Sequence, residues 1–139
     1  MGRMLGIDFG MKHIGLALSD LTQLIAFPLK TIRALHSLEQ TADLIARELV
    51  EIDTIVLGLP LLLSGKDSSI TYTVRCFATI LKAKSNLPLV LWDERLTTVQ
   101  VERILKQDNV KRRKRARYLD TMSATLILQA YLDSSTALK

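Results

Sequence analysis

The segment MLGIDFG, residues 4–10, has the composition of a buried β-strand but carries the carboxylate of Asp8 near its middle. Moving an ionised carboxylate from water into a protein interior is costly unless a metal ion, a basic partner or a raised pKa compensates for it. The rest of the chain must therefore supply that compensation. A local alternative stays open, because Asp8 could accept hydrogen bonds from the turn amides of Gly10 and Met11.

Length and composition indicate a single domain over residues 1–139. The chain has 139 residues, of which 48% are hydrophobic, and this is enough to build one core. The longest apolar runs are too short to cross a bilayer, and the N-terminal residues lack the hydrophobic region of a signal peptide. We therefore expect a cytoplasmic protein that has no membrane partner.

Hydrophobic periodicity and turn residues divide the chain into strands and helices. Strands are predicted at residues 3–9, 14–19, 24–32, 54–58 and 87–92. Helices are predicted at residues 38–52, 70–81, 97–105 and 118–132. Pro28 places the third strand at a sheet edge, and Ser37 with Gln40 forms a capping-box signal for the first helix.

The order of these elements predicts an α/β fold. An antiparallel meander of three strands followed by crossover connections gives a five-stranded mixed sheet with helices on its faces. The first, fourth and fifth strands would run parallel, so their carboxyl ends would meet at one edge of the sheet. Ligands of open α/β sheets bind at such an edge.

Three acidic residues are not easily explained by solvent exposure or by capping. Asp8 lies inside the first strand, Glu94 follows the fifth, and Asp120 lies near the start of the last helix, on the helical face of Ala124 and Ile127. The predicted topology brings all three to one sheet edge, where cations would be needed to offset their repulsion. Carboxylate oxygens suit Mg²⁺ or Mn²⁺, and two such ions about 4 Å apart would hold a phosphodiester for in-line attack by water.

Simpler roles for two of these acids stay open. Glu94 could pair with the neighbouring Arg95, and Asp120 could interact favourably with the helix N-terminal dipole. Trp92, at the end of the fifth strand, could pack in the core or stack on a base.

Basic residues are concentrated in one short segment. The net charge is +5, and six of the seven residues in KRRKRAR, 111–117, are basic. The pattern is typical of a phosphate-backbone contact, although a solvated charged loop is an alternative. The expected nucleic-acid contacts are Lys12, Lys66, Arg95, Lys111, Arg112, Arg113, Lys114, Arg115 and Arg117.

Four motifs resemble the YqgF/RuvX family of RNase H-like nucleases. They are LGIDFGMKHIGLALSD at 5–20, IVLGLP at 55–60, WDERLTT at 92–98 and LDTMSATLILQAYLD at 119–133. The resemblance implies an RNase H-like sheet in the order 3-2-1-4-5 with helices on both faces. It also implies a divalent-metal-dependent nuclease whose acidic site consists of Asp8, Glu94 and Asp120.

The same resemblance implies the substrate class. The favoured role in the family is processing of the 5′ end of the small-subunit (16S) ribosomal RNA precursor, so the expected partners are structured RNA and ribosomal precursor particles. Resolution of Holliday junctions in branched DNA is the alternative within the family. The expected products are a 5′-phosphate and a 3′-hydroxyl.

The chain departs from the family pattern at three places. His13 follows Lys12 where the family usually has arginine, the loop after GLP is apolar, and Ser123 stands where related resolvases often have a second aspartate. Neutral imidazole lacks the bidentate phosphate grip of arginine.

Two other function classes remain alternatives. Actin-like ATPases use a similar strand and hairpin, but they need two lobes to enclose ATP. A catalytically silent nucleic-acid-binding module is the second, and the presence of all three acids speaks against it.

Overall fold

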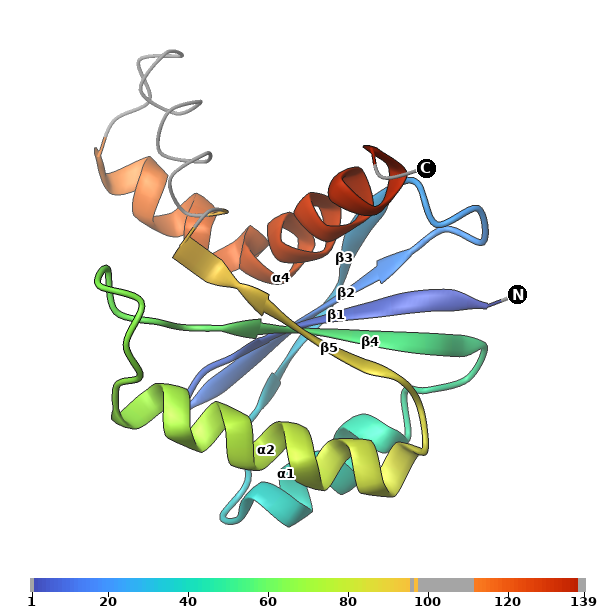
Figure 1. Cartoon of the computed structure of the whole chain (residues 1–139), viewed down its shortest axis with the longest axis horizontal. Coiled ribbons are helices and arrows are strands. Elements are labelled where there is room, and N and C mark those ends of the chain that lie inside the picture. The colour runs from blue at the N-terminus through green and yellow to red at the C-terminus, as the bar shows by residue number, and fades with distance from the viewer. Residues whose placement is uncertain (1, 96, 98–111, 138–139) are drawn as a thin grey trace.

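The computed structural model describes residues 2–95, 97 and 112–137, with side chains described for 2–95, 97 and 122–135 (Figure 1). The elements in chain order are β1 (Arg3–Phe9), β2 (His13–Ser19), β3 (Ala26–Arg33), α1 (Leu38–Ala46), β4 (Ile52–Leu59), α2 (Ser69–Ser85), β5 (Leu89–Asp93) and α4 (Arg112–Ala137). All five predicted strands are therefore confirmed, with small shifts at their ends.

The strands form one five-stranded sheet in the order β3-β2-β1-β4-β5. β1 pairs antiparallel with β2 and parallel with β4, and β4 pairs parallel with β5. This confirms the predicted mixed sheet and its order. The carboxyl ends of β1, β4 and β5 consequently lie at the same edge of the sheet, on the left in Figure 1.

Helices cover both faces of the sheet: α1 and α2 lie on one face and α4 lies on the other (Figure 1). Side chains of a strand alternate between the two faces. Leu5, Ile7 and Phe9 of β1 belong to the core beneath α1 and α2. Gly6 and Asp8 therefore face α4.

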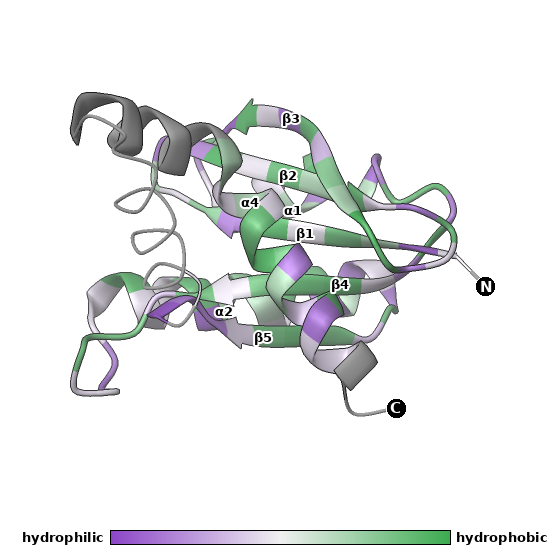
Figure 2. Cartoon of the chain, turned by 90° about the horizontal axis from the view of Figure 1, so that it is seen from above, coloured by the Kyte–Doolittle hydropathy of each residue, from purple (hydrophilic) through white to green (hydrophobic). Residues whose placement is uncertain are grey.

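The core beneath α4 is smaller. Its buried members are Ala17, Val56, Ala124, Ile127, Leu128 and Leu132. Hydrophobic colouring runs along β4 and β5 in Figure 2. β4 is buried along most of its length, as expected for a strand inside the sheet, whereas β5 at the sheet edge is half-buried and exposes Leu91.

The predicted first helix is wrong at its carboxyl end. α1 stops at Ala46, and Ile52, predicted to be its last apolar residue, opens β4 instead. Glu51 has a positive φ of 65°, which a continuing helix does not allow, and its carbonyl oxygen accepts a hydrogen bond of 2.7 Å from the Arg3 amide. Pairing with β1 therefore extends β4 toward its amino end at the expense of the helix.

β3 lies at a sheet edge, as Pro28 predicts. Pro28 is opposite Ala17, at the point where the β2–β3 register shifts. A proline cannot donate to a strand ladder, so an irregularity on an edge strand is where it is tolerated.

The helix predicted at 118–132 is present but starts earlier than predicted, and most of the helix predicted at 97–105 lies outside the described residues. α4 begins at Arg112 and not at Tyr118, so the backbone of the basic segment is helical from Arg112 onward. The predicted helix at 97–105 lies outside the described residues except for Thr97. Within the part of the chain that the structure describes, no helix combines the length and the apolar character needed to span a bilayer.

Candidate active site

Asp8 lies on β1, the central strand, and faces α4. Its backbone partner across β1 and β2 is Gly15. An ideal β-carbon at Gly15 would lie 3.9 Å from Cβ of Asp8 and 3.5 Å from Cβ of Ala124. Asp8 and Ala124 thus both lie next to Gly15, on the face of the sheet that α4 covers.

Glu94 directly follows β5, at the same edge of the sheet. A β-carbon at Gly58 of β4 would collide with Oε1 of Glu94 and would lie 2.7 Å from Cδ1 of Ile127. Only glycine at position 58 therefore lets the Glu94 side chain lie over β4 toward Asp8.

The two carboxyl groups contact each other. Burial raises the pKa of Glu94 to about 8, helped by the charge of Asp8, a side-chain hydrogen bond with Asp8 and the charge of Asp93. Each of these influences favours the protonated carboxyl. Two carboxyl groups held this closely would both ionise only if a cation were present beside them.

The donor set fits a divalent cation with a preference for oxygen. Two carboxylates on one face offer hard oxygen ligands of the kind that Mg²⁺ and Mn²⁺ take. Among the residues whose side chains are described, no group of three His, Cys, Asp or Glu residues could hold a metal. The third predicted acid, Asp120, has a side chain outside the described set.

The backbone of Asp120 belongs to α4, one turn before Ala124. Ala124 lies over Gly15, and Leu128 lies over Gly6, where a β-carbon would be 2.7 Å from Cβ of Leu128. Small residues thus let α4 lie close to β1 and β2. Residues four apart share a helical face, so Asp120 remains the predicted third acid of the site.

Arg95 pairs with Asp93 and not with Glu94. Its Nε donates to both carboxylate oxygens of Asp93 at 3.0 Å, and its Nη2 donates to Oδ2 at 2.6 Å. The guanidinium holds the pKa of Asp93 below its usual range. Nη1 of Arg95 donates to the carbonyl oxygen of Leu63 at 3.2 Å. Arg95 therefore connects the end of β5 to the loop between β4 and α2.

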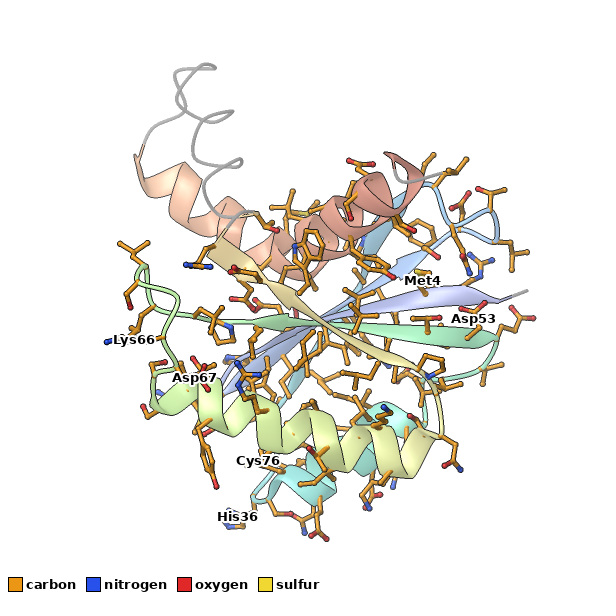
Figure 3. All side chains as sticks on the ribbon, viewed as in Figure 1. Met4, His36, Asp53, Lys66, Asp67 and Cys76 are labelled. Atoms are coloured by element: carbon orange, nitrogen blue, oxygen red, sulfur yellow. The ribbon has the colours of Figure 1, made fainter. Side chains whose placement is uncertain are left out.

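Two of the remaining predicted nucleic-acid contacts have described side chains, and both follow strands that end at this edge. Lys12 is exposed in the β1–β2 turn, and Lys66 is exposed in the β4–α2 loop, where Figure 3 shows it extending away from the ribbon. Lys111 lies outside the described residues, and the side chains of 112–117 are outside the described set. The structure therefore brings together Asp8 and Glu94 and leaves Lys12 and Lys66 at the surface.

Trp92 is half-buried and packs against the core beneath α4, which is the packing role among its two predicted roles. Its ring meets that of Tyr131 edge to face, with centroids 5.8 Å apart, and its indole N–H donates to Oγ1 of Thr97 at 3.1 Å. The ring contact links β5 to α4.

Sequence reasoning missed two residues that shape the site. Gly58 provides the space for Glu94, and Asp93 fixes Arg95. The signal for Gly58 was present, since a glycine inside a buried strand marks a close approach by another group. No sequence signal singled out Asp93, because two other charged residues directly follow it and Arg95 could pair with either acid.

Known proteins similar to this chain fall in one family. A sequence profile of RuvX, described as "Holliday junction resolvase", matches residues 2–134. A protein of Protochlamydia amoebophila is 46% identical over 95% of this chain and 93% of its own length. One from Clostridium acetobutylicum is 42% identical over 95% of this chain and 98% of its own length. Both bear the name "Putative pre-16S rRNA nuclease".

A solved structure supports the fold. RuvC of T. thermophilus, in complex with a Holliday junction substrate, aligns with 95% of this chain and 96% of its own, at a TM-score of 0.51 and 13% identity. The sheet order predicted from the motifs, the profile match over nearly the whole chain and the identity to full-length relatives agree. The chain belongs to the RuvX (YqgF) family of nucleases and has its RNase H-like fold.

Proposed function

We propose that this chain is a divalent-metal-dependent nuclease that hydrolyses phosphodiester bonds during maturation of the 5′ end of the 16S ribosomal RNA precursor. The observation that carries the proposal is the contact between Asp8 and Glu94 at the carboxyl edge of the parallel strands. Such a pair concentrates negative charge where a phosphate polymer would bind, and a binding module without catalysis has no use for that arrangement.

Asp8, Glu94 and Asp120 are the residues that would hold the metal, Mg²⁺ or Mn²⁺. When bound, the ion would supply Lewis-acid stabilisation of the phosphate and would make a nearby water more acidic. The chain itself positions the acids: β1 fixes Asp8, the space over Gly58 admits Glu94, and α4 carries Asp120. α4 also covers Asp8 and limits its access to bulk water.

The basic residues would hold the substrate backbone. Lys12 and Lys66 border the acidic edge, and the helical start of α4 carries most of the segment 111–117. Backbone contacts position a nucleic acid without reading its sequence, which suits recognition of a structured precursor. Arg95, held by Asp93 and Leu63, would act as a positioning residue beside the substrate.

The names of the relatives favour ribosomal precursor RNA, and a cytoplasmic location is part of this proposal. Resolution of branched DNA is the second candidate, because the family profile carries that description and RuvC was solved with a Holliday junction. Symmetric cleavage of a junction requires two active sites, so this candidate also requires a dimer.

The experiment compares cleavage of a precursor RNA that carries the 5′ leader with cleavage of a four-way DNA junction, each with Mg²⁺, Mn²⁺ or EDTA. Asp8→Asn should abolish cleavage of the preferred substrate. Asp43→Asn is the matched control, since Asp43 pairs with Lys84 on the α1–α2 side of the sheet and should leave cleavage unchanged. An Asp8→Asn variant as active as the parent would refute the proposal.

A further inference from the structure

The loop between β4 and α2, residues 60–68, carries an apolar tip beside the acidic edge. The side chain of Leu62 is 49% exposed and that of Leu63 is 92% exposed. A single exposed leucine is ordinary on a protein surface. Here, however, two neighbouring leucines extend into solvent from the loop that Arg95 ties to the residue preceding Glu94.

The tip is held in one conformation by its own backbone. The Leu62 amide donates to the Lys66 carbonyl at 2.9 Å, and the Gly65 amide donates to the Leu62 carbonyl at 2.8 Å. Gly65 has a φ of +88°, which a residue with a side chain rarely adopts. These bonds close a tight turn, and Leu63 lies at its exposed end.

The tip is also fixed relative to the acids. Arg95 donates to the Leu63 carbonyl at 3.2 Å while it binds Asp93, and Arg95 is adjacent in sequence to Glu94. The loop leaves β4 just after Gly58, over which the Glu94 side chain lies. In Figure 1 this loop lies at the same edge of the sheet as the end of β5. A nucleic acid bound at Asp8 and Glu94 would therefore pass close to Leu63.

From this geometry we infer that Leu63, supported by Leu62, inserts into the base stack of the substrate, and that the preferred substrate has an interrupted stack. This inference rests on the proposed function, which supplies nucleic acid as the ligand. Apolar wedges enter nucleic acids between base steps, and the unstacking that they require costs least where the stack is already broken. A branch, a bulge or a junction between single and double strands is such a place.

Charge complementarity favours nucleic acid over a protein as the occupant of the tip. Lys66 is exposed in the same turn and would bind a phosphate next to the inserted leucine. The apolar side chain would contact a base, and the neighbouring cation would contact the phosphate attached to that base.

The test uses a base analogue whose fluorescence rises on unstacking, 2-aminopurine, placed at the branch point of a duplex. Binding and fluorescence are measured with Ca²⁺ on branched and continuous duplexes, and cleavage is measured with Mg²⁺. The variants are Leu63→Ser, Leu63→Phe and Val50→Ser. Val50 is the matched control because it is 79% exposed but precedes β4, at the far end of the sheet.

The full chain should bind the branched duplex about tenfold more tightly than the continuous one and should raise the fluorescence. Leu63→Ser should lose both effects, while Leu63→Phe and Val50→Ser should retain them. A Leu63→Ser variant that binds and unstacks the branched duplex like the parent would overturn the inference. Equal losses in Leu63→Ser and Leu63→Phe would overturn it as well, because loop conformation would then be responsible.

The two proposals fail separately. Unstacking that depends on Leu63 without any cleavage would support the wedge and refute the nuclease. Cleavage by Leu63→Ser with the same ratio of branched to continuous substrate as the parent would support the nuclease and refute the wedge.

Discussion

The Glu94 side chain occupies the space that a side chain at Gly58 would need, because a β-carbon on Gly58 would overlap Oε1 of Glu94. The backbone of β4 thus determines where the carboxyl group of the next strand can lie. This relationship connects a feature of the sheet directly to the acidic pair.

Gly58→Ala should therefore displace Glu94 and abolish cleavage. The added methyl group should also cost about 1–3 kcal/mol of folding stability through overpacking against Ile127. Cleavage assays and urea unfolding measure the two effects. Gly15→Ala is the control for stability, since its β-carbon would meet only ordinary contacts at 3.5 and 3.9 Å. A fully active Gly58→Ala variant would show that Glu94 has another productive position.

Without divalent metal, folding stability should fall as the pH rises from about 4.5 to about 8. Glu94 has a pKa of about 8 in the fold and an ordinary value of 4.5, so the unfolded chain loses this proton first and is favoured as the pH increases. The stabilisation that comes from protonated Glu94 is fully present below pH 4.5 and is lost above a pH of about 8.

Urea unfolding in EDTA across this range measures the effect. The difference between the parent and Glu94→Gln isolates the titration of this carboxyl from that of other groups. Parallel pH curves for the two proteins would show that Glu94 ionises normally.

Asp8→Asn should keep or gain thermal stability in EDTA, because it removes the charge that acts on Glu94. The parent should be stabilised by Mg²⁺ or Mn²⁺, by about 2.7 kcal/mol at a hundredfold excess over the dissociation constant, and the variant should not. Thermal unfolding with and without the ion measures both expectations. Equal stabilisation of the two proteins by the ion would place the metal elsewhere.

Arg95→Lys should loosen the β4–α2 loop while conserving charge. A lysine cannot reproduce the forked contacts to Asp93 together with the bond to Leu63. Hydrogen exchange at the amides of Leu62 and Gly65 should accelerate by several-fold. This corresponds to a loss of about 1 kcal/mol in the free energy of opening the loop, as expected for the partly exposed ion pair of Arg95 with Asp93. Unaltered exchange would mean that the backbone bonds of the turn suffice.

Neutralising three residues of the basic segment, Arg113, Lys114 and Arg115, should flatten the salt dependence of nucleic-acid binding. A segment that touches about four phosphates gives a log–log slope of roughly −3 to −4, and metal affinity should not change. Glutamine replacements of Arg47, which directly follows α1, and of Lys82 and Lys84 on α2 serve as the charge-matched control. A slope equal to that of the parent would show that the segment faces away from the substrate.

The arrangement of the sheet could be predicted from sequence because its signals are local. Turn residues after Phe9 and Ser19, the alternation along β1 and Pro28 at the edge specify the meander without knowledge of tertiary contacts. The end of α1 could not be predicted, because the apolar spacing continues to Ile52 while pairing with β1 converts that residue to strand.

The acidic pair was predictable for a similar reason. Asp8 is anomalous within its strand, and the strand order brings the residue after β5 to the same edge. The partner of Arg95 was not predictable, since Asp93 and Glu94 are both adjacent and only the local backbone decides between them. The contribution of Asp120 depends on a side chain beyond the described set and stays a prediction.

Pro28 on the edge strand β3 affects whether two copies of this chain can associate by pairing their sheet edges. The proline withholds one amide hydrogen, and the register shift beside it breaks the regular row of donors and acceptors that another strand would need. Continuous β-augmentation along this margin is thereby discouraged, at a place where the exposed side chains of Leu24, Ile25 and Leu29 would otherwise favour contact between copies.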